Sequence, residues 1–188
     1  MKKWIIGCSL FCLIATQVAA QIPTFTRGDN VAGLGLGVGG TLYADLFSGY
    51  KQTPYFLLNY EHCIIDNLWD ERSSIGVGGQ MGYASAKWEN SGGAYGWKRS
   101  DFNIGVRGSL HYTFVDKLDT YAGILFSYNI VSYKYWGTSG IETRSNPDNI
   151  MIPTVFAGAR YYLADSFAVF AELGYGVSIF SFGVSFKF

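Results

Sequence analysis

The sequence predicts an all-β fold, an eight-stranded antiparallel up-and-down β-barrel that spans a membrane. Aromatic residues make up 18% of the 188 residues and charged residues only 15%, whereas an average soluble domain is roughly 25% charged. The mean hydropathy of +0.14 is too low for a protein built from apolar helical spans of about 20 residues. Apolar and polar residues alternate with a period of two, which is typical of strands with one apolar face.

The first twenty residues predict a secretory signal peptide, outside the fold. Lys2 and Lys3 precede an uncharged apolar stretch, and small residues place a cleavage site after Ala20. That stretch is shorter than the about 20 residues of a spanning helix, which disfavours a membrane anchor. Cleavage leaves Cys63 as the one cysteine, so no intrachain disulfide is expected and its thiol is interpreted as a packed, unreactive group.

Residues 21–188 are predicted to form the barrel as one domain. The alternation is clearest at the C-terminus, where Phe180, Phe182, Val184, Phe186 and Phe188 share one face. Strands of ten or more residues with repeated aromatics suit a membrane barrel better than a soluble sandwich, whose strands average about five or six residues. The eight expected strands are Ala32–Tyr43, Tyr55–Ile64, Ser74–Lys87, Asp101–Phe114, Thr120–Tyr135, Met151–Leu163, Phe167–Tyr175 and Ile179–Phe188.

The connections alternate in length, as in outer-membrane barrels with short periplasmic turns and long extracellular loops. The expected tight turns are Val115–Asp119 and Ala164–Ser166, and Ile65–Ser73 on the same side is somewhat longer. The expected long, polar loops are Ala44–Pro54, Trp88–Ser100 and Trp136–Ile150. The hairpin at Gly176–Ser178 is short and departs from the pattern. An even strand number places both termini on the periplasmic side. Eight strands enclose an interior that side chains just fill, so no open pore is expected.

Four segments carry a resemblance to a known family. They are Gly33–Gly39, Ser74–Gly79, Ala171–Gly176 and Phe182–Phe188. The chain resembles the small eight-stranded outer-membrane β-barrel proteins related to OmpA and OmpX. The resemblance implies the outer membrane of a Gram-negative type of cell, contact with its lipids and lipopolysaccharide, and insertion by the barrel-assembly machinery, whose recognition signal Phe188 matches. It implies no activity, because such barrels include adhesins, transporters, structural anchors and a few enzymes.

Motifs that would indicate an enzyme or a cofactor are weak. The run from Gly35 to Gly40 fits G-x-G-x-x-G, but it lies within an expected strand and lacks the helix and the acidic residue of a dinucleotide site. The two histidines, His62 and His111, have no metal-ligand spacing. Neither precedes a serine by two residues, as in barrel deacylases, so we expect no enzyme, cofactor or metal. A net charge of zero also argues against nucleic-acid binding, and we expect a monomer.

Strand parity predicts a set of charges inside the barrel. They are Glu61, Arg107, Arg160, Glu172 and Lys187, accompanied by Gln80 and Asn129. Because an isolated buried ion is very costly, we expect these charges to pair and lock the barrel shut. Glu172 lies on the strand between those of Arg160 and Lys187 and is the expected hub. A gated polar path for ions or small solutes is the alternative.

Aromatic residues gather near both expected rims, as in the girdles that anchor barrels at the headgroups. They are Trp88, Trp97, Phe102, Tyr133, Tyr135 and Trp136 toward the loops, and Tyr112, Phe114, Tyr121, Tyr161 and Phe188 toward the short turns. Within one expected loop, Tyr95 and Trp97 lie beside Lys98 and Arg99. This basic, aromatic tip is a candidate contact for anionic lipopolysaccharide or a host surface.

Three functions stay open at this point. The first is a structural or surface-interaction barrel with outward loops, the second a small-solute channel or carrier, and the third a lipid-modifying enzyme. The expected lumen of charges and glycines disfavours a path for hydrophobic solutes, and no catalytic pair is evident. The sequence therefore favours the first function.

Overall fold

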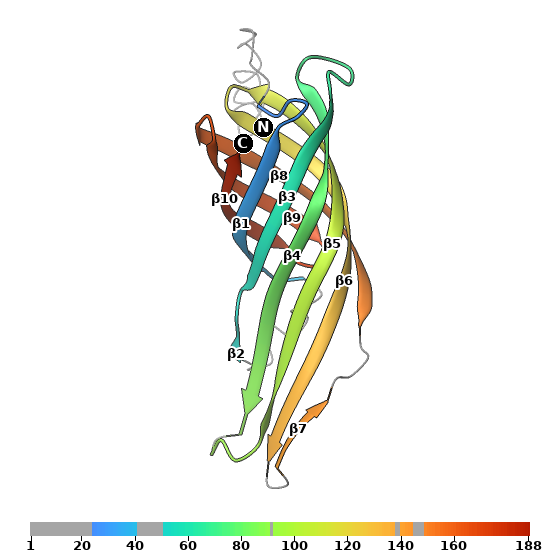
Figure 1. Ribbon diagram of the computed structural model, residues 1–188. Helices are drawn as coiled ribbons and strands as arrows, with labels where there is room; N and C mark the ends of the chain where they lie inside the picture. Colours follow the sequence, from blue (N-terminus) through green and yellow to red (C-terminus); the bar gives the residue numbers. More distant parts are fainter. Residues whose placement is uncertain (1–23, 41–50, 91, 138–139, 145–148) are drawn as a thin grey trace, which may run out of the picture.

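The computed structural model describes residues 24–40, 51–90, 92–137, 140–144 and 149–188 of the chain. Eight long strands form a closed antiparallel ring (Figure 1). In ring order they are β1 (Asn30–Val38), β3 (Tyr55–Asp66), β4 (Ser73–Glu89), β5 (Gly96–Val115), β6 (Leu118–Gly137), β8 (Ile150–Ala164), β9 (Phe167–Tyr175) and β10 (Phe180–Lys187). The pairing of β1 with β10 closes the ring, from Val31 opposite Lys187 to Val38 opposite Phe180. No described helix has the length and apolar character needed to cross a bilayer.

The two ends of the barrel differ, as the connection lengths predict. The short turns β3–β4, β5–β6 and β8–β9 lie at the end where Asn30 of β1 bonds to the C-terminal Phe188. At the other end, β4, β5 and β6 run well past the remaining strands, and the short strands β2 (Lys51–Gln52) and β7 (Gly140–Arg144) pair at the margins of this extension (Figure 1). We call these ends the turn end and the hairpin end.

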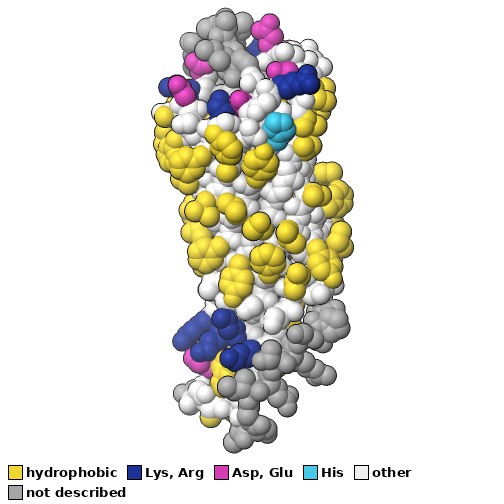
Figure 2. All heavy atoms as spheres, in the orientation of Figure 1, with side chains coloured by type: hydrophobic (Ala, Val, Ile, Leu, Met, Phe, Trp, Pro, Cys, Tyr) yellow, Lys and Arg dark blue, Asp and Glu magenta, His cyan; other side chains and the backbone are white. Residues whose placement is uncertain are grey.

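The outer face of the ring carries a belt of many large, exposed apolar side chains, and Figure 2 shows one side of it. Exposed fractions reach 67% at Val106, 63% at Leu173 and 81% at Tyr175. A belt of this size is incompatible with water, and it provides the lipid-facing surface of a membrane-spanning barrel. Exposed aromatic side chains lie toward both ends of the belt. Those toward the turn end are Phe114, Tyr161, Phe186 and Phe188, and those toward the hairpin end are Phe56, Tyr83, Phe102, Tyr128 and Tyr175. Tyr121 does not belong to this girdle, because it faces the lumen and is only 4% exposed.

The first strand ends earlier than the alternation predicts. It stops at Val38 because Gly39 and Gly40 adopt positive φ angles of 72° and 100°, a conformation that glycine favours and that breaks the extended chain. The expected remainder of this strand, to Tyr43, lies partly outside the described residues. The expected signal peptide, residues 1–20, lies wholly outside them.

The expected loop Trp88–Ser100 is mostly strand. β4 continues to Glu89 and β5 starts at Gly96, which leaves a connection of Asn90–Tyr95. The period of two continues through this segment. From Gly96 onward β5 pairs with β4 on one side and with β6 on the other, so the backbone groups are satisfied on both sides. The expected loop Trp136–Ile150 likewise contains β7. The described part of the hairpin end is therefore largely a sheet of extended strands.

Candidate functional site: the charged lumen and the hairpin end

Four of the expected lumen charges meet inside the barrel. Arg160 on β8 lies between two carboxylates, with Nη1 3.0 Å from Asp119 Oδ2 and Nη2 3.0 Å from Glu61 Oε2. Arg107 on β5 donates to Glu172 Oε1 at 2.9 Å, and its Nε is 3.5 Å from Glu61 Oε1. All five side chains are buried, with exposed fractions between 0% and 8%. Such buried charges persist only when they are paired, so this network holds five strands together across the lumen.

Glu172 is not the hub that strand order predicts. Its carboxylate accepts hydrogen bonds from Arg107 and from the Tyr121 hydroxyl, the latter also at 2.9 Å. Glu61 occupies the centre instead, because its two oxygens serve both Arg107 and Arg160. The residue opposite Glu172 on β8 is Gly158, two positions from Arg160.

Lys187 lies apart from this network, at the rim of the turn end. Its Nζ donates to the Thr24 carbonyl at 3.2 Å, lies 3.8 Å from Asp29 Oδ2, and sits over the Tyr162 ring. The side chain is 26% exposed. Lys187 therefore binds the segment that precedes β1 and takes no part in the ion network of the lumen.

The two uncharged residues expected in the lumen are both buried there. Gln80 accepts a hydrogen bond from Arg107 Nη1 at 3.1 Å, and so belongs to the network. Asn129 lies nearer the hairpin end, where its amide donates to Asp101 at 2.8 Å.

The lumen also contains a serine, a histidine and an aspartate that the sequence alone does not bring together. His111 Nε2 is 3.0 Å from Ser109 Oγ, and His111 Nδ1 is 2.9 Å from Asp119 Oδ1. Ser109 and His111 share the lumen side of β5, but Asp119 falls in an expected turn and only the register of β5 with β6 brings it near. This connectivity is that of a Ser-His-Asp hydrolase, so the sequence-based exclusion of a catalytic set was incomplete.

The hydrogen bonds of Ser109 argue against catalysis. Its hydroxyl donates to Glu61, and a hydroxyl has a single proton to donate. His111 Nε2 must then donate to Ser109 Oγ, so it cannot take the proton of a nucleophile. The Phe25 ring lies 4.4 Å from the His111 ring, and Ser109 is only 5% exposed. The set is arranged as part of a buried network, without room for a substrate.

We expect Ser109 to be unreactive toward a fluorophosphonate probe. The folded barrel should show no labelling above that of a Ser109→Ala variant, while a serine hydrolase treated in parallel is labelled fully. Labelling that disappears in the Ser109→Ala variant would establish a reactive serine and contradict this interpretation.

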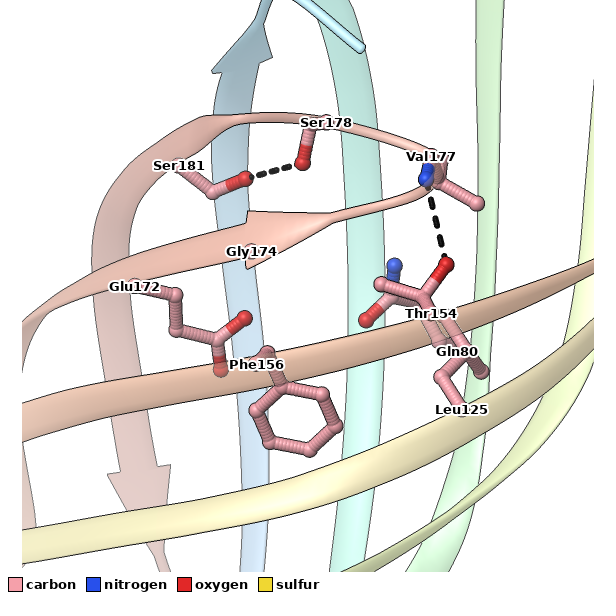
Figure 3. Close-up of a pocket in the computed structure, with 9 residues that line it drawn as sticks. All are labelled: Gln80, Leu125, Thr154, Phe156, Glu172, Gly174, Val177, Ser178 and Ser181. Atoms are coloured by element: carbon pink, nitrogen blue, oxygen red, sulfur yellow. Dashed lines mark hydrogen bonds between the residues drawn. The ribbon is translucent and has the colours of Figure 1, made fainter. Parts of the chain in front are cut away.

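Both mouths of the lumen are filled by the chain itself. At the turn end, Thr24 and Phe25 are buried, and the Thr24 amide donates to Thr113 Oγ1 at 3.2 Å. Toward the hairpin end, the β9–β10 turn folds inward, and Val177 is 1% exposed with its amide donating to Thr154 Oγ1 at 3.1 Å (Figure 3). Val177 joins an apolar layer with Tyr55, Leu57, Leu125, Ile152, Phe156 and Phe170.

This apolar layer corrects the expectation of a lumen lined by charges and glycines. A cavity between the layer, Glu172 and the β9–β10 turn has a volume of only about 10 Å³ (Figure 3), room for about one water molecule. Within the described residues, no group of His, Cys, Asp and Glu side chains is arranged to hold a metal ion. Cys63 is a free thiol, fully buried beside Phe25 and Val31.

The residues of the expected basic, aromatic tip occupy different places. Tyr95 lies in the β4–β5 connection and is 54% exposed. Trp97, Lys98 and Arg99 are consecutive residues of β5, so their side chains alternate between its two faces. Arg99 forms a two-fold hydrogen bond to Asp101 at 2.8 Å, while Lys98 points outward with the lipid-facing residues. The four do not form one contact surface.

A closed ring of eight antiparallel strands, an apolar outer face and an interior filled by charged and apolar side chains define a small transmembrane β-barrel. Comparison with solved structures gives the same fold. A crystal structure of Ail, the attachment invasion locus protein of Yersinia pestis, in complex with the heparin analogue sucrose octasulfate, has a TM-score of 0.56 at 11% identity, covering 87% of this chain and 100% of that one. A de novo designed transmembrane β-barrel has a TM-score of 0.51 at 17% identity, covering 87% and 98%. No protein-family model and no curated protein sequence matches the chain.

Proposed function

We propose that this chain is an integral outer-membrane protein that presents its hairpin end to the cell exterior and transports no solute. The observation that carries this proposal is the sealed lumen. Arg160 is held between Glu61 and Asp119, and Phe25 and Val177 are buried toward the two mouths. The extension of β4, β5 and β6 beyond the belt supports a role in surface interaction, because it offers both faces of a sheet outside the bilayer (Figure 1).

Further parts of this proposal concern export and assembly. We propose that residues 1–20 direct export and are removed after Ala20, and that the barrel-assembly machinery recognises the terminal strand through Phe188. This residue is 71% exposed, and its backbone pairs with Asn30 in both directions. An aromatic side chain is thus presented at the seam where the ring closes. We further propose that the folded barrel is a monomer surrounded by lipid.

Planar bilayers containing the purified barrel should show no steady channel current. The lumen network leaves no continuous polar path, and the cavity in it has room for about one water molecule. A general porin reconstituted in the same way provides the positive control. Reproducible open-channel steps that persist after further purification would reject the sealed barrel and support the small-solute channel.

A further inference from the structure

Four lysines lie side by side on the outer face of the hairpin end. Strand register places Lys51 opposite Lys87, Lys87 opposite Lys98, and Lys98 opposite Lys134, so that one row crosses β2, β4, β5 and β6. Neighbouring strands are about 4.8 Å apart, so the row extends over roughly 15 Å. All four are exposed, and Figure 2 shows basic side chains gathered just beyond the apolar belt.

Like charges directly opposite one another destabilise a sheet, and the row is only partly compensated. Glu89 lies 2.7 Å from Lys87 Nζ and 3.9 Å from Lys51 Nζ. The hydrogen bond and the charge of Lys87 lower the pKa of the Glu89 carboxyl, so this compensation is present at neutral pH. Among the side chains of residues 24–40, 51–90, 92–137 and 149–188, no carboxylate lies within ion-pair distance of Lys98 or Lys134. Within that part of the chain, the positive charge of Lys98 and Lys134 is therefore not neutralised by an ion pair.

Only one row of serines separates the lysines from the apolar belt. The last apolar row toward the hairpin end is Tyr83, Phe102 and Ile130, followed by Ser85, Ser100 and Ser132, and then by Lys87, Lys98 and Lys134. Four residues advance about 13 Å along a strand, or about 10 Å along the membrane normal for a strand tilted by about 40°. Lysine side chains can bend back toward the membrane, which brings their ammonium groups to the level of lipid phosphates.

The outer surface below the row contains an apolar groove. It lies on β3, β4 and β5, nearer the centre of the belt, and is lined by Leu58, Tyr60, Gly79, Met81 and Ile104. The groove exists because Gly79 has no side chain to fill it. The nearest atom to the position that a Gly79 Cβ would occupy is the Gly105 carbonyl oxygen. An apolar groove below a row of lysines suits a lipid, whose acyl chains would contact the groove and whose phosphorylated headgroup would contact the lysines.

We propose that Lys87, Lys98 and Lys134 bind the phosphate groups of a glycolipid in the outer leaflet, with Lys51 at the margin of the same site. This inference rests on the proposed outward orientation of the hairpin end. A soluble polyanion would also be attracted to the lysines. The lipid is favoured because the row lies on the membrane-facing side of the sheet and continues the apolar belt.

The test compares the wild-type barrel with a Lys87→Gln/Lys98→Gln/Lys134→Gln variant in detergent micelles, with diphosphorylated lipid A as the probe. Each lysine near an anionic surface contributes a roughly fivefold gain in affinity, so the triple variant should bind roughly a hundredfold more weakly. Lys117→Gln, at the exposed β5–β6 turn of the opposite end, is the control and should bind like the wild type. Wild-type binding should also weaken when the phosphates of lipid A are removed, and when salt is raised from 0.05 M to 0.5 M, about a 3-fold fall in screening length.

Folding provides a separate measurement. In vesicles of phosphatidylcholine alone, the triple variant should unfold at the same or a higher urea concentration than the wild type. It loses the repulsion within the row, and the Lys87–Glu89 pair that it also loses is exposed and contributes little. Equal lipid A binding by the triple variant and the wild type would overturn the proposal. So would lysine-dependent binding of a heparin fragment without binding of lipid A, which would assign the row to a soluble polyanion. The bilayer current tests the sealed lumen and the lipid A measurement tests the lysine row. Failure of one proposal can therefore be recognised without the other.

Discussion

Replacing Arg160 with methionine is expected to cost the barrel about 3–5 kcal/mol of unfolding free energy, because removing one cation from a buried ion network leaves its carboxylates with uncompensated negative charge. Both carboxylates that face Arg160 are inaccessible to water, with side-chain exposures of 1% for Glu61 and 0% for Asp119. Methionine has a similar length, so the packing of the lumen changes little. The measurement is urea unfolding of the two proteins in lipid vesicles.

Two further variants separate charge from packing. Adding Asp119→Asn to Arg160→Met removes one negative charge from the network that has lost a cation, and should recover part of the loss. Glu89→Gln removes an ion-pair partner at the exposed hairpin end and should leave the unfolding curve unchanged, since exposed pairs contribute little. If Arg160→Met costs less than about 1 kcal/mol, the value of an exposed pair, water must reach Glu61 and Asp119, and the lumen is not sealed.

Parity along each strand is sufficient to predict which side chains face the lumen. A period of two fixes the face of every residue once one is known. It predicts an interior position for Glu61, Arg107, Arg160 and Glu172, and the structure buries all four. Parity does not predict which of them meet. Contacts across a barrel depend on the stagger between strands, and this stagger places Gly158 and Ser181 beside Glu172 in place of Arg160 and Lys187.

The same limit explains what the sequence did not reveal at the hairpin end. The three lysines of the row, Lys87, Lys98 and Lys134, belong to three different strands. The two connections between these strands do not fix the register by their lengths. Polar composition between Trp88 and Ser100 suggested a loop, yet the alternation of side chains continues there and predicts strand once pairing partners exist on both sides. Lumen filling by Thr24, Phe25 and Val177 is likewise invisible to periodicity, because these residues lie outside the strands.

Two adjacent glycines of β4 are expected to respond to alanine with opposite signs. Gly78 faces the lumen between Glu61 and Arg107, and an added methyl group would overlap the carbonyl oxygen of Tyr60 on β3. Because the obstacle is backbone, no side-chain rotation relieves it, and β3 and β4 must separate at the centre of the ion network. Gly78→Ala should therefore destabilise the barrel by about 3 kcal/mol or more, the upper range for overpacking.

Gly79 is the matched control, since it lies one residue away on the lipid-facing side. The nearest atom to an added methyl group there is the Gly105 carbonyl oxygen, at an ordinary contact distance of 3.4 Å. Gly79→Ala also reduces the conformational freedom of the unfolded chain, which stabilises a protein by about 0.4–1 kcal/mol where the backbone permits it. Urea unfolding in vesicles should thus move to lower concentration for Gly78→Ala and to equal or higher concentration for Gly79→Ala. Equal shifts of the urea midpoint in the two variants would mean that β4 does not pair with β3 and β5 in this register. The contact between Glu61 and Arg107, which depends on that register, would then be wrong.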